Sequence, residues 1–219
     1  MTKSQKLIIG IFIFLLFVGF SYLVQKQIFK SFDFDTTVRF QDHIDATIGQ
    51  RRGFDTLLST LSLFGSVEVS VLILLVFLAI RRNFGLSILV LFSFVSIHFF
   101  EIFGKLFVRH PGPPFLFLRY NINFLFPTSY VQPGFSYPSG HAGRATFISF
   151  IVIYFVLTSK RFSALQKVLI SCLFILFDLG MLISRVYLGE HWTTDVIGGT
   201  LLGLALSLFT VSLAENSKT

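Results

Sequence analysis

The chain has 219 residues, of which 53% are hydrophobic and only 13% are charged, and its formal net charge is +7. A soluble domain carries about 25% charged residues, so this composition excludes an ordinary soluble domain and indicates an integral membrane protein. The basic residues are scattered at the ends of apolar segments, which favours a role in membrane topology over nucleic-acid binding. The single cysteine, Cys172, lies in an apolar run, so we expect neither a disulfide framework nor a thiolate metal site.

Six apolar runs of about twenty residues are each long enough to cross the hydrocarbon core of a bilayer. The first follows a short basic start and leads into polar residues without a small-residue cleavage site, so we expect an uncleaved span. The polar segment 31–53 predicts an amphipathic surface loop or an interfacial helix. The predicted spans are 7–24, 54–80, 84–107, 139–158, 165–187 and 194–213.

The sequence therefore predicts an all-α, polytopic membrane protein with six transmembrane helices. We find no repeat, low-complexity tract or linker, so one domain over residues 1–219 is expected. The positive-inside rule favours both termini in the cytoplasm, because the short segments then inside are rich in basic residues. These are Lys3, Lys6, Arg81, Arg82, Lys160, Arg161, Lys167 and Lys218.

The stretch SRVYLGEHWTTD at 184–195 places an arginine, a histidine and a carboxylate at fixed intervals at the end of an apolar run. Arg185 can hold a phosphate by two parallel hydrogen bonds, and a neutral His191 offers a nucleophilic ring nitrogen. Asp195, four residues further on, can accept the hydrogen of the other ring nitrogen. The pattern predicts an anion-binding group beside an oriented nucleophile.

A second histidine, His141, ends the sequence PSGH at 138–141 and directly precedes another apolar run. Ser139 and the backbone N–H of Gly140 would then lie at a helix N-terminus, which suits an anion. Lys105 ends a third apolar run. In the predicted topology all three pieces fall on the outer face of the membrane, where they would form one site that removes phosphate from a lipid.

These motifs resemble the type 2 phosphatidic acid phosphatase superfamily. Ser184-Arg185, five residues, His191, three residues and Asp195 match its third signature, PSGH matches the second, and the resemblance spans about 84–213. The first signature is a lysine followed after six residues by Arg-Pro. Here Lys105 is followed at that distance by Gly112-Pro113, so one arginine is absent from its usual place.

The resemblance implies a metal-independent mechanism without a cofactor. His191 would attack phosphorus and form a phosphohistidine, Asp195 would fix its tautomer, and His141 would protonate the leaving oxygen and then assist water. The substrate would be a membrane lipid of the undecaprenyl diphosphate or phosphatidic acid type. The phosphate would be held by Lys105, Arg185, Ser139, Gly140 and Arg119, the last replacing the absent arginine in preference to Arg109.

Two other functions stay open at this point. The phosphohistidine could pass its group to a second lipid or sugar, or the chain could bind or transport lipid without turnover. The absent arginine at Gly112 favours binding alone, whereas the paired histidines favour the enzyme. The role of the acidic residues in the apolar runs also stays open between positioning the cationic site and bonding helices together; these are Glu68, Glu101 and Asp178. Arg144, three residues after His141, could bind substrate or pair with an acid. The oligomeric state does not follow from the sequence.

Overall fold

The computed structural model describes residues 1–47, 51–119 and 134–214. Its helices are α1 (Lys3–Gln25), α2 (Lys30–Thr47), α3 (Arg51–Leu63), α4 (Val67–Arg81), α5 (Phe84–Phe107), the short 3-10 helix η1 (Phe115–Phe117), α6 (Gly140–Thr158), α7 (Ala164–Tyr187) and α8 (Thr193–Ala214). Polar residues set several of their starts. Thr2, Asn83 and Ser163 each accept a hydrogen bond from the backbone N–H three residues further on, as helix N-caps do.

Five of these helices are long and apolar enough to cross a membrane, namely α1, α5, α6, α7 and α8. A sixth span is obtained if α3 and α4 are counted together, although the chain bends by 56° between them. The predicted all-α, polytopic fold is confirmed. The second predicted span, within 54–80, is made of two helices, because the helix is interrupted at residues 64–66.

The interruption is a tight turn centred on Gly65. The N–H groups of Phe64, Gly65 and Ser66 each bond to the carbonyl three residues back, and Ser66 then caps α4. The carbonyl oxygen of Gly65 accepts a hydrogen bond from Nε of Arg144 on α6, at 3.0 Å. Non-helical backbone is tolerated at membrane depth where neighbouring protein groups satisfy it, and Arg144 has that effect here.

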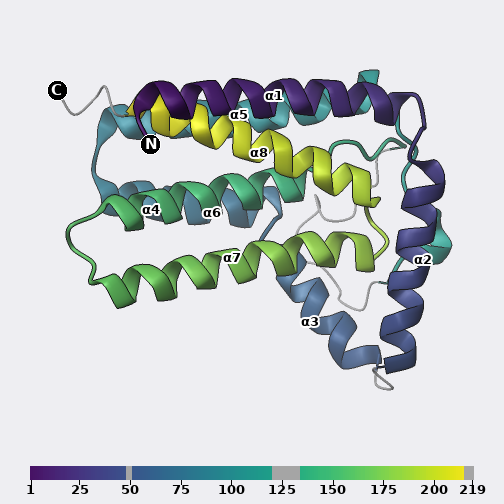
Figure 1. Ribbon diagram of the computed structural model, residues 1–219. Coiled ribbons are helices and arrows are strands. Elements are labelled where there is room, and N and C mark those ends of the chain that lie inside the picture. The colour runs from purple at the N-terminus through teal and green to yellow at the C-terminus, as the bar shows by residue number, and fades with distance from the viewer. Residues whose placement is uncertain (48–50, 120–133, 215–219) are drawn as a thin grey trace.

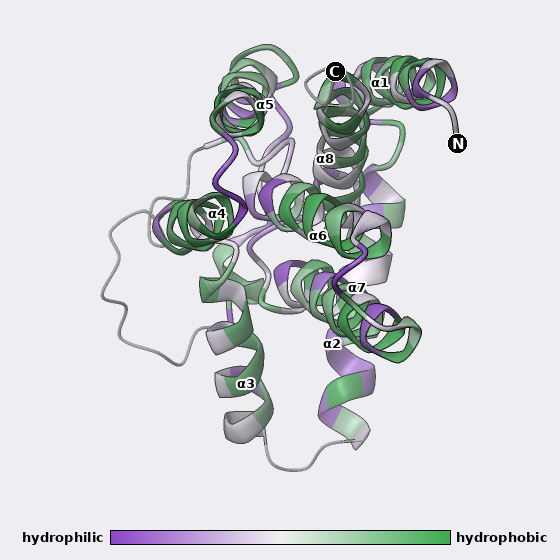
Figure 2. Cartoon of the chain, turned by 90° about the vertical axis from the view of Figure 1, so that its left-hand side faces the viewer, coloured by the Kyte–Doolittle hydropathy of each residue, from purple (hydrophilic) through white to green (hydrophobic). Residues whose placement is uncertain are grey.

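The centre of the bundle is formed by α6 and α8. In their most apolar windows 72% and 67% of the residues are buried, against at most 28% in α1, α5 and α7. Glycines bring the two backbones together: a Cβ on Gly203 would lie 2.5 Å from the carbonyl oxygen of Gly143, and small residues permit such close approach. Figure 2 shows α6 surrounded by α4, α5, α7 and α8.

Helix α2 crosses one end of this bundle, nearly at right angles to the spans (Figure 1). It occupies most of the polar segment for which a surface loop or an interfacial helix was expected. Helix α1 starts and α8 ends at the opposite end of the bundle, where the Ser212 hydroxyl donates to the carbonyl oxygen of Lys3 at 3.2 Å. The fold thus separates the described ends of the chain from the end covered by α2.

Candidate active site

The stretch 184–195 forms the end of α7, a tight turn and the first turn of α8. Gly189 has a φ of +70°, and a Cβ there would lie 2.2 Å from the carbonyl oxygen of Phe117, so glycine is required at this position. The N–H of His191 donates to the carbonyl oxygen of Arg185 at 3.2 Å. The turn therefore brings His191 back to the end of α7, beside Asp195.

The second motif begins α6 next to this turn. The N–H of Ser139 donates to the carbonyl oxygen of Asp195 at 2.9 Å, and the Ser139 side chain caps α6. The Glu101 carboxyl group of α5 lies directly against Gly140, where a Cβ would fall within 2.4 Å of all three carboxyl atoms. Glycine at 140 therefore lets α5 approach the start of α6, and His141 follows in the same turn.

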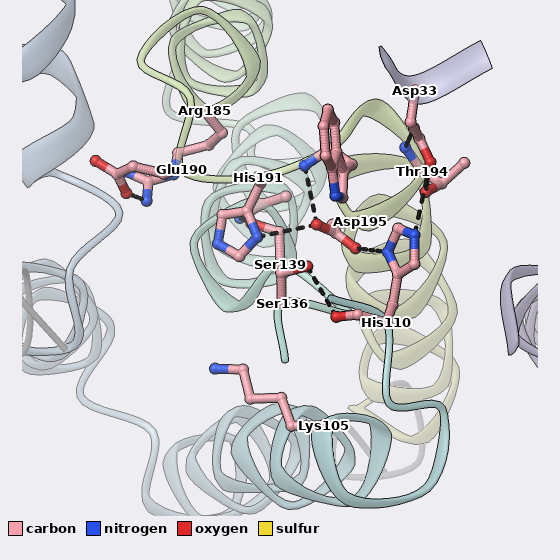
Figure 3. A network of polar contacts seen from close by, with 12 residues as sticks. Asp33, Lys105, His110, Ser136, Ser139, Arg185, Glu190, His191, Thr194 and Asp195 are labelled. Atoms are coloured by element: carbon pink, nitrogen blue, oxygen red, sulfur yellow. Dashed lines mark hydrogen bonds and ion pairs between the residues drawn. The ribbon is translucent and has the colours of Figure 1, made fainter. Parts of the chain in front are cut away.

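Asp195 is fully buried and lies between two imidazole rings (Figure 3). Its Oδ2 atom is 3.5 Å from Nδ1 of His191 and accepts the N–H of Trp192 at 2.9 Å. Its Oδ1 atom is 2.9 Å from Nδ1 of His110. A carboxylate in this place favours a proton on Nδ1 of His191, so that Nε2 carries the lone pair.

Lys105 and Arg185 supply positive charge from α5 and α7. Nζ of Lys105 donates to Oε1 of Glu101 at 2.6 Å. Arg185 is only 2% exposed, and its guanidinium contacts the Glu190 carboxylate and the Ser62 hydroxyl. Both cations therefore already have partners that an incoming phosphate would have to displace or share.

The protonation state of His191 follows from these surroundings. Burial lowers the pKa of the His191 imidazole, and the charges of Arg185 and Lys105 lower it further, which outweighs the raising effect of Asp195. His191 is therefore neutral near pH 7, as a nucleophile must be.

A third cation, Arg144, lies beside His141 and is 2% exposed. Its Nη1 atom donates to Oε2 of Glu101 at 2.9 Å, and its Nη2 atom is 3.5 Å from Nδ1 of His141. A guanidinium can only donate, so this contact favours the His141 tautomer that is protonated at Nε2. In the described parts of the chain, no group of three or more His, Cys, Asp or Glu residues has the arrangement of a metal site.

The family model of the PAP2 superfamily matches residues 83–218. The chain belongs to the PAP2 superfamily. The resemblance seen in the two sequence motifs is thereby confirmed, and the matched range contains all of α5 to α8.

Two relatives of this PAP2 chain are similar to part of it. Phosphatidylglycerophosphatase B of Bacillus subtilis (strain 168) is 34% identical over 87 residues, which are 40% of this chain and 43% of that protein. Undecaprenyl-diphosphatase of Sulfolobus acidocaldarius is 36% identical over 98 residues, which are 42% of this chain and 41% of that protein. Each alignment thus covers less than half of the relative's length.

Solved structures share the PAP2 fold over most of the chain. The crystal structure of a transmembrane PAP2-type phosphatidylglycerolphosphate phosphatase from Bacillus subtilis has a TM-score of 0.72 at 20% identity, covering 94% of this chain and 96% of that one. LpxE of Aquifex aeolicus has a TM-score of 0.59, also at 20% identity, covering 82% and 94%. At this identity the likeness concerns the fold alone.

This fold gathers the sequence-predicted site residues at the end of the bundle that α2 crosses, but Arg119 is engaged there by other partners. Its guanidinium donates to both carboxylate oxygens of Asp45, at 2.6 and 2.9 Å, and to the Tyr187 hydroxyl at 3.2 Å. Such two-point pairing with a carboxylate is strong. Arg119 is therefore held against α2 and α7, and its contacts do not support a role in place of the absent arginine. Arg109 instead donates to the carbonyl oxygen of Leu106.

The structure also adds polar residues that sequence reasoning missed or left open. His110 and Asp33 were missed, because they join the site only through contacts with α8 that are distant in sequence: His110 bonds to Asp195, and Asp33 bonds to Thr194. Arg144 had been left open, although its position gave a signal. It lies three residues after His141 inside an apolar run, where a charged side chain is costly and suggests a function. Asp178 accepts hydrogen bonds from Thr146 at 3.2 and 3.3 Å, so it joins α6 to α7.

Proposed function

We propose that this chain hydrolyses a lipid phosphate or diphosphate monoester through a phosphohistidine intermediate on His191. The observation that carries the proposal is the contact between Nδ1 of His191 and the buried Asp195 carboxylate, beside Arg185, Lys105 and His141. Binding an anion requires the cations alone. An oriented, neutral histidine with a second histidine nearby has a use only if a bond to phosphorus is made and broken.

In the first step Nε2 of His191 attacks phosphorus. The N–P bond forms as the bond from phosphorus to the leaving oxygen breaks. That oxygen takes a proton from Nε2 of a His141 imidazolium, which becomes a neutral imidazole. Asp195 stabilises the positive charge that develops on the His191 ring. The His141 imidazolium also carries a proton on Nδ1, so Arg144, which can only donate, no longer pairs with that nitrogen at this step and pairs with it again once His141 is neutral.

In the second step water attacks the phosphohistidine. His141, now without its proton, takes a proton from the water, the N–P bond breaks, and inorganic phosphate leaves with His191 restored. If a lipid or sugar hydroxyl replaced water, the same step would be a phosphotransfer.

The non-bridging oxygens would be held by Lys105, Arg185 and the start of α6, with Ser139 and the N–H of Gly140. Glu190 is then a competitor, because its carboxylate occupies the Arg185 guanidinium that the phosphate needs. Arg119 is paired with Asp45, so Arg144 is better placed to take over the role of the absent arginine. It shares the Glu101 carboxylate with Lys105.

A lipid substrate is supported by the surroundings of Lys105. Phe103, Leu106 and Phe107 on the same helix are 48–59% exposed, so a headgroup at Lys105 would have apolar surface beside it for its acyl or prenyl chains. The names of the relatives favour phosphatidylglycerophosphate or undecaprenyl diphosphate as the type of substrate. The charge distribution supports a membrane orientation with both termini cytoplasmic and the site outside.

The test is phosphate release by purified protein in detergent, with EDTA present, from polyprenyl diphosphate, phosphatidylglycerophosphate and phosphatidic acid. His191→Ala should abolish release, whereas His43→Ala, which removes an exposed histidine on α2, should not. Phosphorylated acceptor in excess of free phosphate would show transfer. Lipid binding by folded protein without any turnover would refute hydrolysis.

A further inference from the structure

The imidazole that hydrogen-bonds to Asp195 is that of His110 and not that of the nucleophile. Nδ1 of His110 lies 2.9 Å from Oδ1 of Asp195, whereas Nδ1 of His191 lies 3.5 Å from Oδ2. The orientation of the carboxylate therefore depends on His110 more than on His191.

His110 is in turn backed by a second carboxylate, from α2. Its Nε2 atom is 3.8 Å from Oδ2 of Asp33. Asp33 is itself fixed, since it accepts hydrogen bonds from the N–H and the hydroxyl of Thr194 at 2.9 and 2.7 Å. The three side chains are almost completely buried, with 1% of Asp33, 7% of His110 and none of Asp195 exposed.

The carboxylates of Asp195 and Asp33 on either side of His110 favour its protonated form. Burial lowers the pKa of His110, but the hydrogen bond to Asp195 and the negative charges of Asp195 and Asp33 outweigh it, so the pKa is raised. A cation between two buried carboxylates reduces the cost of burying them. It also reduces the negative charge that Asp195 presents to His191.

We propose that His110, held by Asp33, is a positioning residue that turns the Asp195 carboxylate toward Nδ1 of His191 and keeps the nucleophile neutral. The proposal rests on the proposed function of His191. It also gives α2 a part in the reaction, because Asp33 belongs to that helix (Figure 3).

The surroundings of His110 allow a clean substitution. His110, Asp33 and Trp192 line a cavity of about 690 Å³ between α2 and the 110–114 segment. The backbone of His110 is held independently of its ring, since its carbonyl oxygen accepts the N–H of Ser136 at 2.9 Å. A changed side chain at 110 therefore has space, and the loop keeps its own hydrogen bond.

Two amide substitutions separate the positioning effect from packing. Asparagine places its NH₂ near the position of Nδ1, so His110→Asn keeps a donor to Asp195, whereas the longer side chain in His110→Gln reaches the Nε2 position instead. We expect His110→Gln to lower kcat by about 10- to 100-fold with little change in KM, and His110→Asn to lose several-fold less. Ser31→Ala, on the wall of the same cavity, is the matched control.

A pH readout distinguishes this role from a structural one. The charged and titratable groups that face His191 are Lys105 from α5, His141 from α6, Arg185 from α7 and Asp195 from α8. His110→Gln leaves these four in place but removes the cation behind Asp195. The pKa of His191 should therefore rise, and the acid limb of kcat/KM should move to higher pH.

The same pKa can be followed by NMR of histidine-labelled protein, which needs no turnover. An upward shift for His191 in His110→Gln supports the proposal even if the substrate is misassigned. Equal losses in His110→Asn and His110→Gln with an unmoved His191 pKa would overturn it, as would an unchanged kcat in His110→Gln. An inactive wild-type protein, in contrast, would count against the proposed function.

Discussion

Asp195→Asn is the substitution whose effect follows most directly from the geometry. Oδ1 of the carboxylate faces His110, and Oδ2 faces both the N–H of Trp192 and Nδ1 of His191. An amide has one accepting and one donating end. If its oxygen stays toward His110, its NH₂ meets the Trp192 N–H and draws the His191 proton onto Nε2, the attacking atom. If it flips, its NH₂ faces the donor of His110.

The size of the effect can be scaled from the distances. Replacing the carboxylate beside a catalytic histidine lowers kcat about 10⁴-fold where that carboxylate is the principal partner of the ring. Here the contact with His191 is 3.5 Å and His110 makes the shorter one. We therefore expect a smaller loss, about 10²- to 10³-fold, which corresponds to about 3–4 kcal/mol of transition-state stabilisation. Two donors facing each other should also destabilise the fold by about 1–3 kcal/mol.

The assay is phosphate release under saturating lipid, with thermal unfolding measured on the same preparation. Asp42→Asn, which changes an exposed aspartate on α2, is the matched control and should leave both measurements unchanged. If folded Asp195→Asn lost less than about threefold in kcat, the argument that Asp195 orients the nucleophile would be refuted.

Three further results are expected. Glu190→Gln removes the carboxylate that competes with the substrate phosphate for Arg185. Loss of a competing interaction of roughly 1 kcal/mol should lower KM about fivefold, and a raised KM would contradict this. The pKa of His191 is lowered, so kcat/KM should fall only as pH drops through a value below the usual 6.5; an acid limb above 7 in a pH–rate profile would show the sign to be wrong. Gly199→Val should lower the unfolding temperature and the activity together, because a Cβ there would lie 2.3 Å from the carbonyl oxygen of Ser139. Circular dichroism and the phosphate assay measure the two effects, and a change in only one of them would contradict the expectation.

The sequence predicted the helical membrane fold because local rules decide it. Apolar runs of the length of a bilayer and polar N-caps such as Ser139 mark where most spans begin and end. The motif residues could also be assigned to one end of the bundle, since Lys105, His141 and Asp195 stand at the ends of α5, α6 and α8.

Contacts between distant elements could not be predicted in this way. The break at Gly65 is stabilised by Arg144, 79 positions later in the chain, although the Gly-Ser pair before an acidic first turn was a readable sign of a new helix start. The pairing of Arg119 with Asp45 and the association of Asp33 with His110 depend on where α2 lies across the bundle. No spacing in the sequence specifies that placement.

The central claim is that phosphate passes through His191, and trapping the phosphorylated protein tests it most directly. Protein mixed with ³²P-labelled lipid phosphate, quenched in base and digested, should carry an acid-labile phosphate on the peptide containing His191. The label should be absent in His191→Ala. In His141→Gln it should both form and decay more slowly than in the wild type, because His141 acts in both steps. Label on another residue, or full turnover with no labelled protein on any timescale, would contradict the account.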